Sequence, residues 1–238
     1  FKRLYQISPL GMVGMLFQGF TISMTIGMGI IYANFIGMNS FQSSVFLASL
    51  TIGNLILQFP VGKISDIFDR RFVILIVSFF SFITTGIAIF LSENYSLMFI
   101  IMGIYGGLSY TIYSLCIAHT NDYLPPKQMV GASSTLITVN GIGATLGSPV
   151  IAILMSYFGN NYFFITLSTA FFLFSIFIVI RIFSRQSIPN EAQGPFVAVP
   201  EIGTAIATPL NPETDWNTNQ QKEDENIFSD NPYYNEIE

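Results

Sequence analysis

Charged residues are scarce in this sequence. They make up 10% of its 238 residues, whereas 51% are hydrophobic, and the mean hydropathy is +0.57. Soluble domains carry about 25% charged residues. A chain with so few charges cannot cover its surface with water-facing groups, so the composition excludes an ordinary soluble domain and predicts a membrane protein.

Patterns typical of catalysis and cofactor binding are also missing. Cys116 is the only cysteine, which rules out an intramolecular disulfide. The sequence has no P-loop, no Rossmann glycine pattern, no metal-ligand cluster and no nucleophile elbow. We therefore expect no enzyme activity, no cofactor, no metal site and no ATP-driven transport. The basic residues form no single patch, so a nucleic-acid partner is not expected either.

Six apolar stretches dominate the first 185 residues. A helix needs about 20 mostly apolar residues to cross a lipid bilayer, and each stretch is close to that length. The predicted spans are residues 9–31, 41–62, 72–90, 97–119, 131–155 and 162–182. We therefore predict an all-α membrane protein in which residues 1–185 form a domain of six transmembrane helices.

The last 53 residues differ in character. Residues 186–238 contain one Lys, ten Asp or Glu and six prolines. A segment this acidic and rich in proline cannot bury enough apolar surface to fold by itself. We expect residues 186–238 to be a largely disordered, acidic tail.

The basic residues all fall on one side of the predicted membrane. All nine Lys and Arg lie before the first span, after the sixth, or in the second-to-third and fourth-to-fifth connections. The other connections, residues 36–40, 91–96 and 156–161, contain no Lys or Arg. The positive-inside rule then places both termini and the tail in the cytoplasm, as in a multi-pass protein of the plasma (inner) membrane.

Residues 62–71 read GKISDIFDRR and connect the second span to the third. This segment resembles the signature loop of the major facilitator superfamily, G-x-x-x-D-[RK]-x-G-[RK]-[RK]. The matching residues are Gly62, Asp66, Arg70 and Arg71. The resemblance implies a secondary transporter, which when complete has twelve spans in two six-helix halves. The chain is similar to the C-terminal half, so a missing N-terminal half is an implied partner.

The resemblance also implies roles for the matching residues. The acid at the position of Asp66 would brace one open state by pairing with charges and with a helix end, which makes Asp66, Arg70 and Arg71 gating residues. Ile67 and Asp69 depart from the pattern and imply a weaker or rewired gate. The alternative is a solvated turn of any multispan protein. Pro60 predicts that the second span ends or bends just before the motif.

Three shorter segments resemble the bacterial YcaD-like branch of the same superfamily. They are residues 118–122, 130–134 and 196–212, the last reading FVAVPEIGTAIATPLNP. This resemblance points to no particular substrate, so the transported molecule is an unknown small solute.

A few polar residues near mid-span are candidates to line a transport cavity. They are Gln18, Asn54, Tyr113 and Asn140. Polar side chains at membrane depth face a bundle interior or a water-filled cavity, and we expect these to share one interior surface. The alternative is that they only hold helices together by hydrogen bonds. No Asp, Glu, Lys or Arg lies deep in a span, so ion-coupling residues would belong to the other half, unless His119 at the cytoplasmic end of the fourth span serves.

The sequence therefore predicts the C-terminal half of a secondary active transporter that works by alternating access. The competing hypothesis is a non-transporting fragment, or a stand-alone six-span membrane protein from a split or truncated gene. The sequence just upstream of the chain discriminates between them, because a neighbouring six-span segment favours the transporter.

The predicted topology can be tested by labelling. Single cysteines at Asn39, Asn94 and Asn160 should react with a membrane-impermeant reagent added outside intact cells, because their connections carry no Lys or Arg. Reporter fusions at the same three positions give an independent measurement. Protection of these positions from outside reagent would contradict the orientation.

Overall fold

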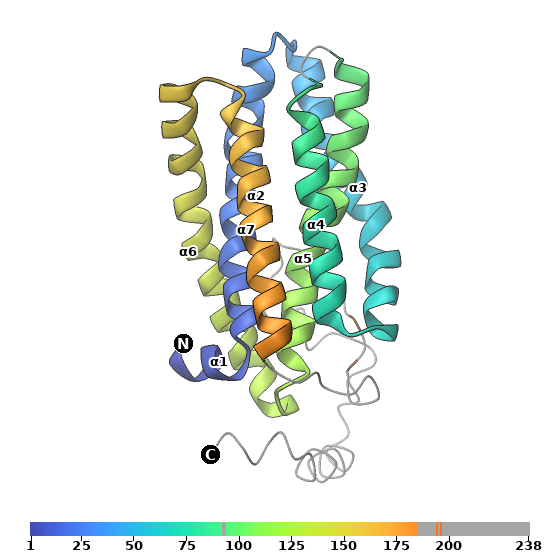
Figure 1. Cartoon of the computed structure of the whole chain (residues 1–238), viewed down its shortest axis with the longest axis vertical. Coiled ribbons are helices and arrows are strands. Elements are labelled where there is room, and N and C mark those ends of the chain that lie inside the picture. Colours follow the sequence, from blue (N-terminus) through green and yellow to red (C-terminus); the bar gives the residue numbers. More distant parts are fainter. Residues whose placement is uncertain (92–93, 185–193, 195, 197–238) are drawn as a thin grey trace.

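The computed structural model of the protein describes residues 1–91, 94–184, 194 and 196. Within these residues it contains seven α-helices and no β-strand (Figure 1). The helices are α1 (Lys2–Ile7), α2 (Pro9–Phe35), α3 (Ser40–Ile67), α4 (Arg70–Ala88), α5 (Tyr95–Asn121), α6 (Pro126–Phe158) and α7 (Tyr162–Ser184).

Helices α2 to α7 correspond to the six predicted spans. Each is long and apolar enough to cross a membrane, so the predicted all-α fold with six transmembrane helices is confirmed. The short helix α1, which precedes the first span, was not predicted. The predicted acidic tail of residues 186–238 lies outside the described residues, apart from Gly194 and Phe196.

The second span differs from the prediction at its end. The sequence predicts either an end or a bend near Pro60; an end is wrong, because α3 continues to Ile67 with Pro60 inside it. Proline removes one backbone hydrogen bond, a loss that transmembrane helices tolerate. Gly62 and Asp66 are therefore helical rather than part of a loop, and only Phe68 and Asp69 separate α3 from α4.

Helix α5 is the most enclosed of the six spans. In its most apolar window 72% of the residues are buried, against 28% in the corresponding windows of α3 and α6. It packs against α2, α3, α4 and α6. The last turn of α5 is therefore held among the ends of several other helices, where the candidate site lies.

Small residues allow the closest helix contacts. Gly53 of α3 lies against the backbone of Gly103 in α5, and Gly19 of α2 lies against the backbone of Asn140 in α6. A side chain at either glycine would overlap the facing backbone. Close backbone approach of this kind is a main source of packing between helices in lipid.

The outward faces of the helices differ in polarity. All exposed residues of α4 are large and hydrophobic: Phe72, Ile76, Phe79, Phe80 and Ile87. Helices α3 and α6 also expose large hydrophobic residues near mid-span, such as Leu55 and Leu146, but small and hydroxyl-bearing residues are exposed among them: Thr51, Thr138, Gly141 and Thr145. The face of α4 suits lipid, whereas small and hydroxyl-bearing residues are typical of helix interfaces inside membranes.

Basic residues gather at one end of the bundle, drawn at the bottom of Figure 1. We call it the basic end, and its members include Lys2, Arg3, Lys63, Arg70, Arg71 and Arg181. The first turns of α2 and α4 and the last turns of α3, α5 and α7 meet there (Figure 1). Charged side chains on different helices are therefore brought together at this end.

The helix contact at Gly53 predicts a clear effect on stability. Gly53→Ala should lower the free energy of unfolding by about 1–3 kcal/mol, because the added methyl group meets the Gly103 carbonyl. Unfolding by a denaturing detergent in micelles measures this change. Gly141→Ala is the matched control, since no atom lies within 4 Å of its added methyl group. Equal effects of the two substitutions would contradict the packing described.

Candidate functional site

Arg70 is the centre of the candidate site. It begins α4, and only 1% of it is exposed. Its Nη1 donates to Asp122 Oδ1 at 2.6 Å and its Nη2 donates to Asp66 Oδ1 at 3.1 Å. A buried charge is tolerated only when it is paired, and here one guanidinium is shared by two carboxylates. We call Asp66, Arg70 and Asp122 the charge network; it joins the ends of α3, α4 and α5.

Local structure places Asp66 and Arg70 side by side. Helix α3 ends at Ile67 and α4 begins three residues later, so the two side chains lie four positions apart across a very short break. Asp69 caps α4 by accepting the backbone N–H of Arg71 at 3.0 Å. Such caps satisfy the free N–H groups of a first helical turn, and this one fixes the direction in which α4 leaves the break.

Asp69 also separates the two adjacent arginines. The Arg71 guanidinium lies against the Asp69 carboxylate, with Nη2 2.7 Å from Oδ2, while Arg70 turns to the charge network. Burial raises the pKa of Asp69, but the hydrogen bonds from Arg71 outweigh it and hold that pKa below its ordinary value. The residue that departs from the superfamily pattern thus gives Arg71 a partner of its own.

Asp122 is the buried acid of the charge network. It caps the end of α5, and its side chain is 4% exposed. Burial raises the pKa of Asp122 to about 6, against the opposing pull of the Arg70 guanidinium and of a hydrogen bond from the Gly194 N–H. The carboxyl group is therefore ionised at neutral pH and loses its charge in mildly acidic solution.

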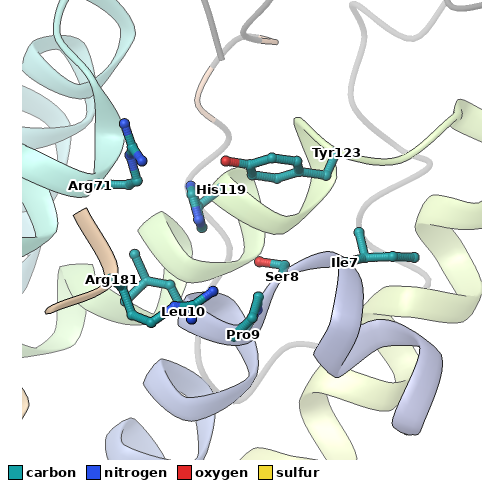
Figure 2. Close-up of a pocket in the computed structure, with 8 residues that line it drawn as sticks. All are labelled: Ile7, Ser8, Pro9, Leu10, Arg71, His119, Tyr123 and Arg181. Carbon is teal, nitrogen blue, oxygen red and sulfur yellow. The ribbon is translucent and has the colours of Figure 1, made fainter. Parts of the chain in front are cut away.

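A small basic pocket lies beside the charge network (Figure 2). Its polar lining comes from Ser8, Arg71, His119, Tyr123 and Arg181, which belong to α2, α4, α5, α7 and the residues that flank them. The pocket has a volume of about 20 Å³, which is room for roughly one water molecule. It is therefore too small to hold a transported solute.

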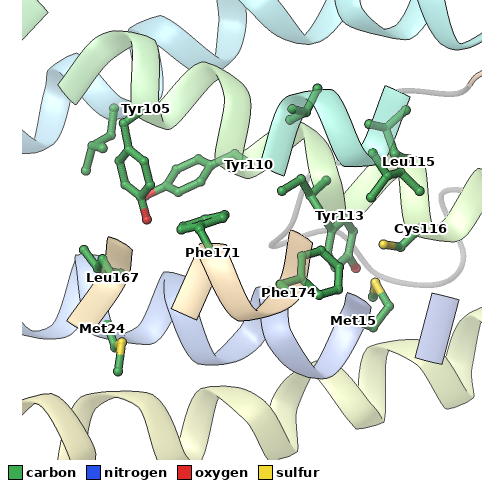
Figure 3. Close-up of a cluster of buried hydrophobic side chains, with 14 of the residues drawn as sticks. Met15, Met24, Tyr105, Tyr110, Tyr113, Leu115, Cys116, Leu167, Phe171 and Phe174 are labelled. Atoms are coloured by element: carbon green, nitrogen blue, oxygen red, sulfur yellow. The ribbon is translucent and has the colours of Figure 1, made fainter. Parts of the chain in front are cut away.

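Two of the predicted cavity residues lie between α2 and α5. Gln18 is fully buried on α2, four residues after Gly14, which packs on α5. Seven residues further along the same face, Thr25 shares a 3.1 Å hydrogen bond with Tyr105. Tyr113 is buried on α5, in the cluster of aromatic and aliphatic side chains shown in Figure 3.

The other two predicted cavity residues lie on α6 and α3. Asn140 is on α6, and its Nδ2 donates to the Met15 carbonyl of α2 at 3.1 Å. Asn54 is half-buried on α3, and its Oδ1 has no hydrogen-bond partner among the described residues. That the four residues share one interior surface, and that they contact a solute, stay predictions.

Asp122 is the site residue that the sequence reasoning missed. A usable signal was present, because residues 1–185 contain only four Asp or Glu and Asp122 is one of three on the predicted cytoplasmic side. A count of charges on that side would have marked it as a partner for an arginine. No local pattern in the sequence indicates how close the end of α5 lies to the start of α4.

Comparison with known proteins assigns the family. A model described as Major Facilitator Superfamily matches residues 11–220, which include the six spans and the charge network. The chain belongs to the major facilitator superfamily. The resemblance expected from residues 62–71 is therefore confirmed, and the chain is a multi-pass membrane protein of a transporter family.

Relatives within the superfamily are transporters by name. Proteins called "Uncharacterized MFS-type transporter YcaD" from Escherichia fergusonii and from Escherichia coli K12 are each 25% identical to this chain over 170 residues. The matched region is 71% of this chain and 44% of each relative. The chain therefore spans less than half the length of these superfamily members.

The charge network predicts a large effect of removing its cation. Arg70→Gln should lower the free energy of unfolding by about 3–5 kcal/mol, because two carboxylates are left without their shared guanidinium. Thermal or detergent-induced unfolding of the purified protein measures the loss. Arg3→Gln makes the same chemical change at an exposed position and should alter stability by less than about 0.5 kcal/mol. A small, equal effect of both variants would show that the network adds no stability.

Proposed function

We propose that this chain is the C-terminal half of a secondary active transporter that moves a small solute across the inner membrane. Transport occurs by alternating access, in which this six-helix bundle rocks against an N-terminal bundle around a site near mid-membrane. Both termini and the basic end face the cytoplasm, in accordance with the positive-inside rule. The chain acts as a transporter and not as an enzyme.

The polarity of the outward faces is the observation that carries this proposal. Helices α3 and α6 expose Thr51, Thr138 and Thr145 among their exposed hydrophobic residues, whereas every exposed residue of α4 is large and hydrophobic. The Thr138 and Thr145 hydroxyls bond to carbonyls of their own helix, so they are tolerated in lipid but gain nothing from it. A second helical bundle is the partner that such a face fits, and the matched region is only 44% of each relative, which leaves room for one.

The gate lies at the basic end in this proposal. Gly62, Asp66, Arg70 and Arg71 occupy the positions of the superfamily signature, and the ion pairs around Arg70 hold three helix ends together. The Asp66 side chain is 38% exposed while that of Arg70 is 2% exposed, so Asp66 is the network member that a second bundle can reach. Loosening of this network accompanies opening of the cytoplasmic side.

The solute site is formed near mid-membrane with the help of polar side chains of this half. Gln18, Asn54 and Tyr113 are the candidates, and the buried Asn54 Oδ1, which has no hydrogen-bond partner within the described part of the chain, marks α3 as one wall. Asn140 already bonds to the Met15 carbonyl, so its first role is to join α6 to α2. Coupling residues, if transport is ion-driven, belong to the N-terminal half.

Transport by the whole protein tests the proposal. The full gene product that contains this chain is reconstituted into liposomes and assayed for uptake of a panel of labelled metabolites under proton and sodium gradients. Solute uptake that depends on the protein supports a transporter. Absence of an adjoining six-span segment together with no uptake would favour the alternative, a non-transporting fragment or stand-alone membrane protein.

Asp66 provides the sharpest variant for this assay. Asp66→Asn should reduce uptake at least about tenfold, because loss of one charge removes an ion pair that favours one conformation by roughly 1.4 kcal/mol or more. The amount of protein in the membrane should stay within about twofold of wild type. Lys63→Gln, three residues earlier on α3 and exposed, is the control. Normal uptake by Asp66→Asn would mean that Asp66 is only a surface charge.

A further inference from the structure

Two residues beyond α7 return to the charge network. They are Gly194 and Phe196, and we call them the strap. The N–H of Gly194 donates to Asp122 Oδ1 at 3.1 Å, and its carbonyl accepts from Arg70 Nη2. The N–H of Phe196 donates to Asp66 Oδ1 at 2.7 Å. Backbone groups of the strap thus contact all three members of the network.

The Phe196 ring adds an apolar contact to these hydrogen bonds. It lies directly on Gly62, where even a methyl group would overlap the ring, and it packs against the edge of the hydrophobic core. Gly62 belongs to the superfamily signature, and in this protein its missing side chain makes room for Phe196. The contact requires both a glycine at position 62 and a large flat side chain at position 196.

The charges of the network explain why a backbone segment fits here. Two carboxylates share one guanidinium, which leaves a net charge of about −1 if both are ionised. Backbone N–H groups are good partners for this excess negative charge, because hydrogen bonds to ionised acceptors are strong. The N–H groups of Gly194 and Phe196 supply one donor to each carboxylate.

We propose that Gly62, Asp66, Arg70 and Asp122 form a docking site for the chain's own C-terminal segment, and that the docked strap acts as a latch. The latch holds the ends of α3, α4 and α5 in the arrangement seen here, and its release loosens them. Its effect on transport rests on the function proposed above, whereas the docking itself does not.

Hydrogen exchange of the full protein in nanodiscs tests the latch. Phe196→Ala should speed amide exchange roughly tenfold in peptides that cover residues 60–72 and 118–124, because the loosened segment opens more often. Phe183→Ala removes the same ring from an 87% exposed position and should leave exchange unchanged. Exchange within about twofold of wild type in Phe196→Ala would overturn the proposal.

A second variant disrupts the same contact by changing Gly62 instead of Phe196. Gly62→Leu fills the space occupied by the Phe196 ring and should give the same faster exchange, whereas Gly131→Leu, at a position open on all sides, should not. Combining Gly62→Leu with Phe196→Ala should add little to either alone, since both break one contact. Fully additive effects would mean that the two residues act separately and would refute the latch.

Uptake in liposomes separates the latch from the proposed function. Faster exchange in Phe196→Ala, in a protein that carries no solute of the panel, supports the latch and counts against the transporter. Solute uptake by the wild-type protein, together with unchanged amide exchange in Phe196→Ala, supports the transporter and refutes the latch. If the latch and the transporter are both supported, Phe196→Ala should also change the uptake rate, while Phe183→Ala should not.

Discussion

A single buried guanidinium determines the arrangement of the basic end. Arg70 lies at the start of α4 and pairs with carboxylates from the end of α3 and the end of α5. Because the charge is almost fully removed from water, its position is stable only while both partners stay close. Three helices are therefore fixed to one another at one point. The strap binds to Arg70 there, and the basic pocket is lined by the adjacent Arg71.

Away from the basic end, the packing of the bundle depends on glycines at the helix contacts. Glycines at positions 19 and 53 let α2 approach α6 and α3 approach α5 until backbones touch. These close pairs leave the outer faces of α3 and α6 uncovered, whereas α5 is enclosed. The bundle thus has one face suited to lipid and another suited to a second protein surface. In the function proposed above, a gate at the basic end is coupled to rocking about that uncovered face.

Much of the fold could be predicted because membranes impose simple rules. Hydrophobic length identified the six spans, and their ends agree with the helices within a few residues except near the basic end. There α3 runs to Ile67 rather than to residue 62, and α6 begins at Pro126 rather than at 131. These extensions are polar helical turns, which hydropathy alone does not distinguish from loops. Of the candidate site, Asp66, Arg70 and Arg71 were found from spacing, but Asp122, the second partner of Arg70, was not.

The sequence by itself determined the class of the protein, the number of spans, the segregation of basic residues and the family. Each of these follows from composition or from residues close together in the chain. Only the tertiary structure decided that Asp122 pairs with Arg70, that Asn140 bonds to the Met15 carbonyl, and that Phe196 covers Gly62. These contacts join residues far apart in sequence, and their formation depends on helix rotation and depth, which no local pattern encodes.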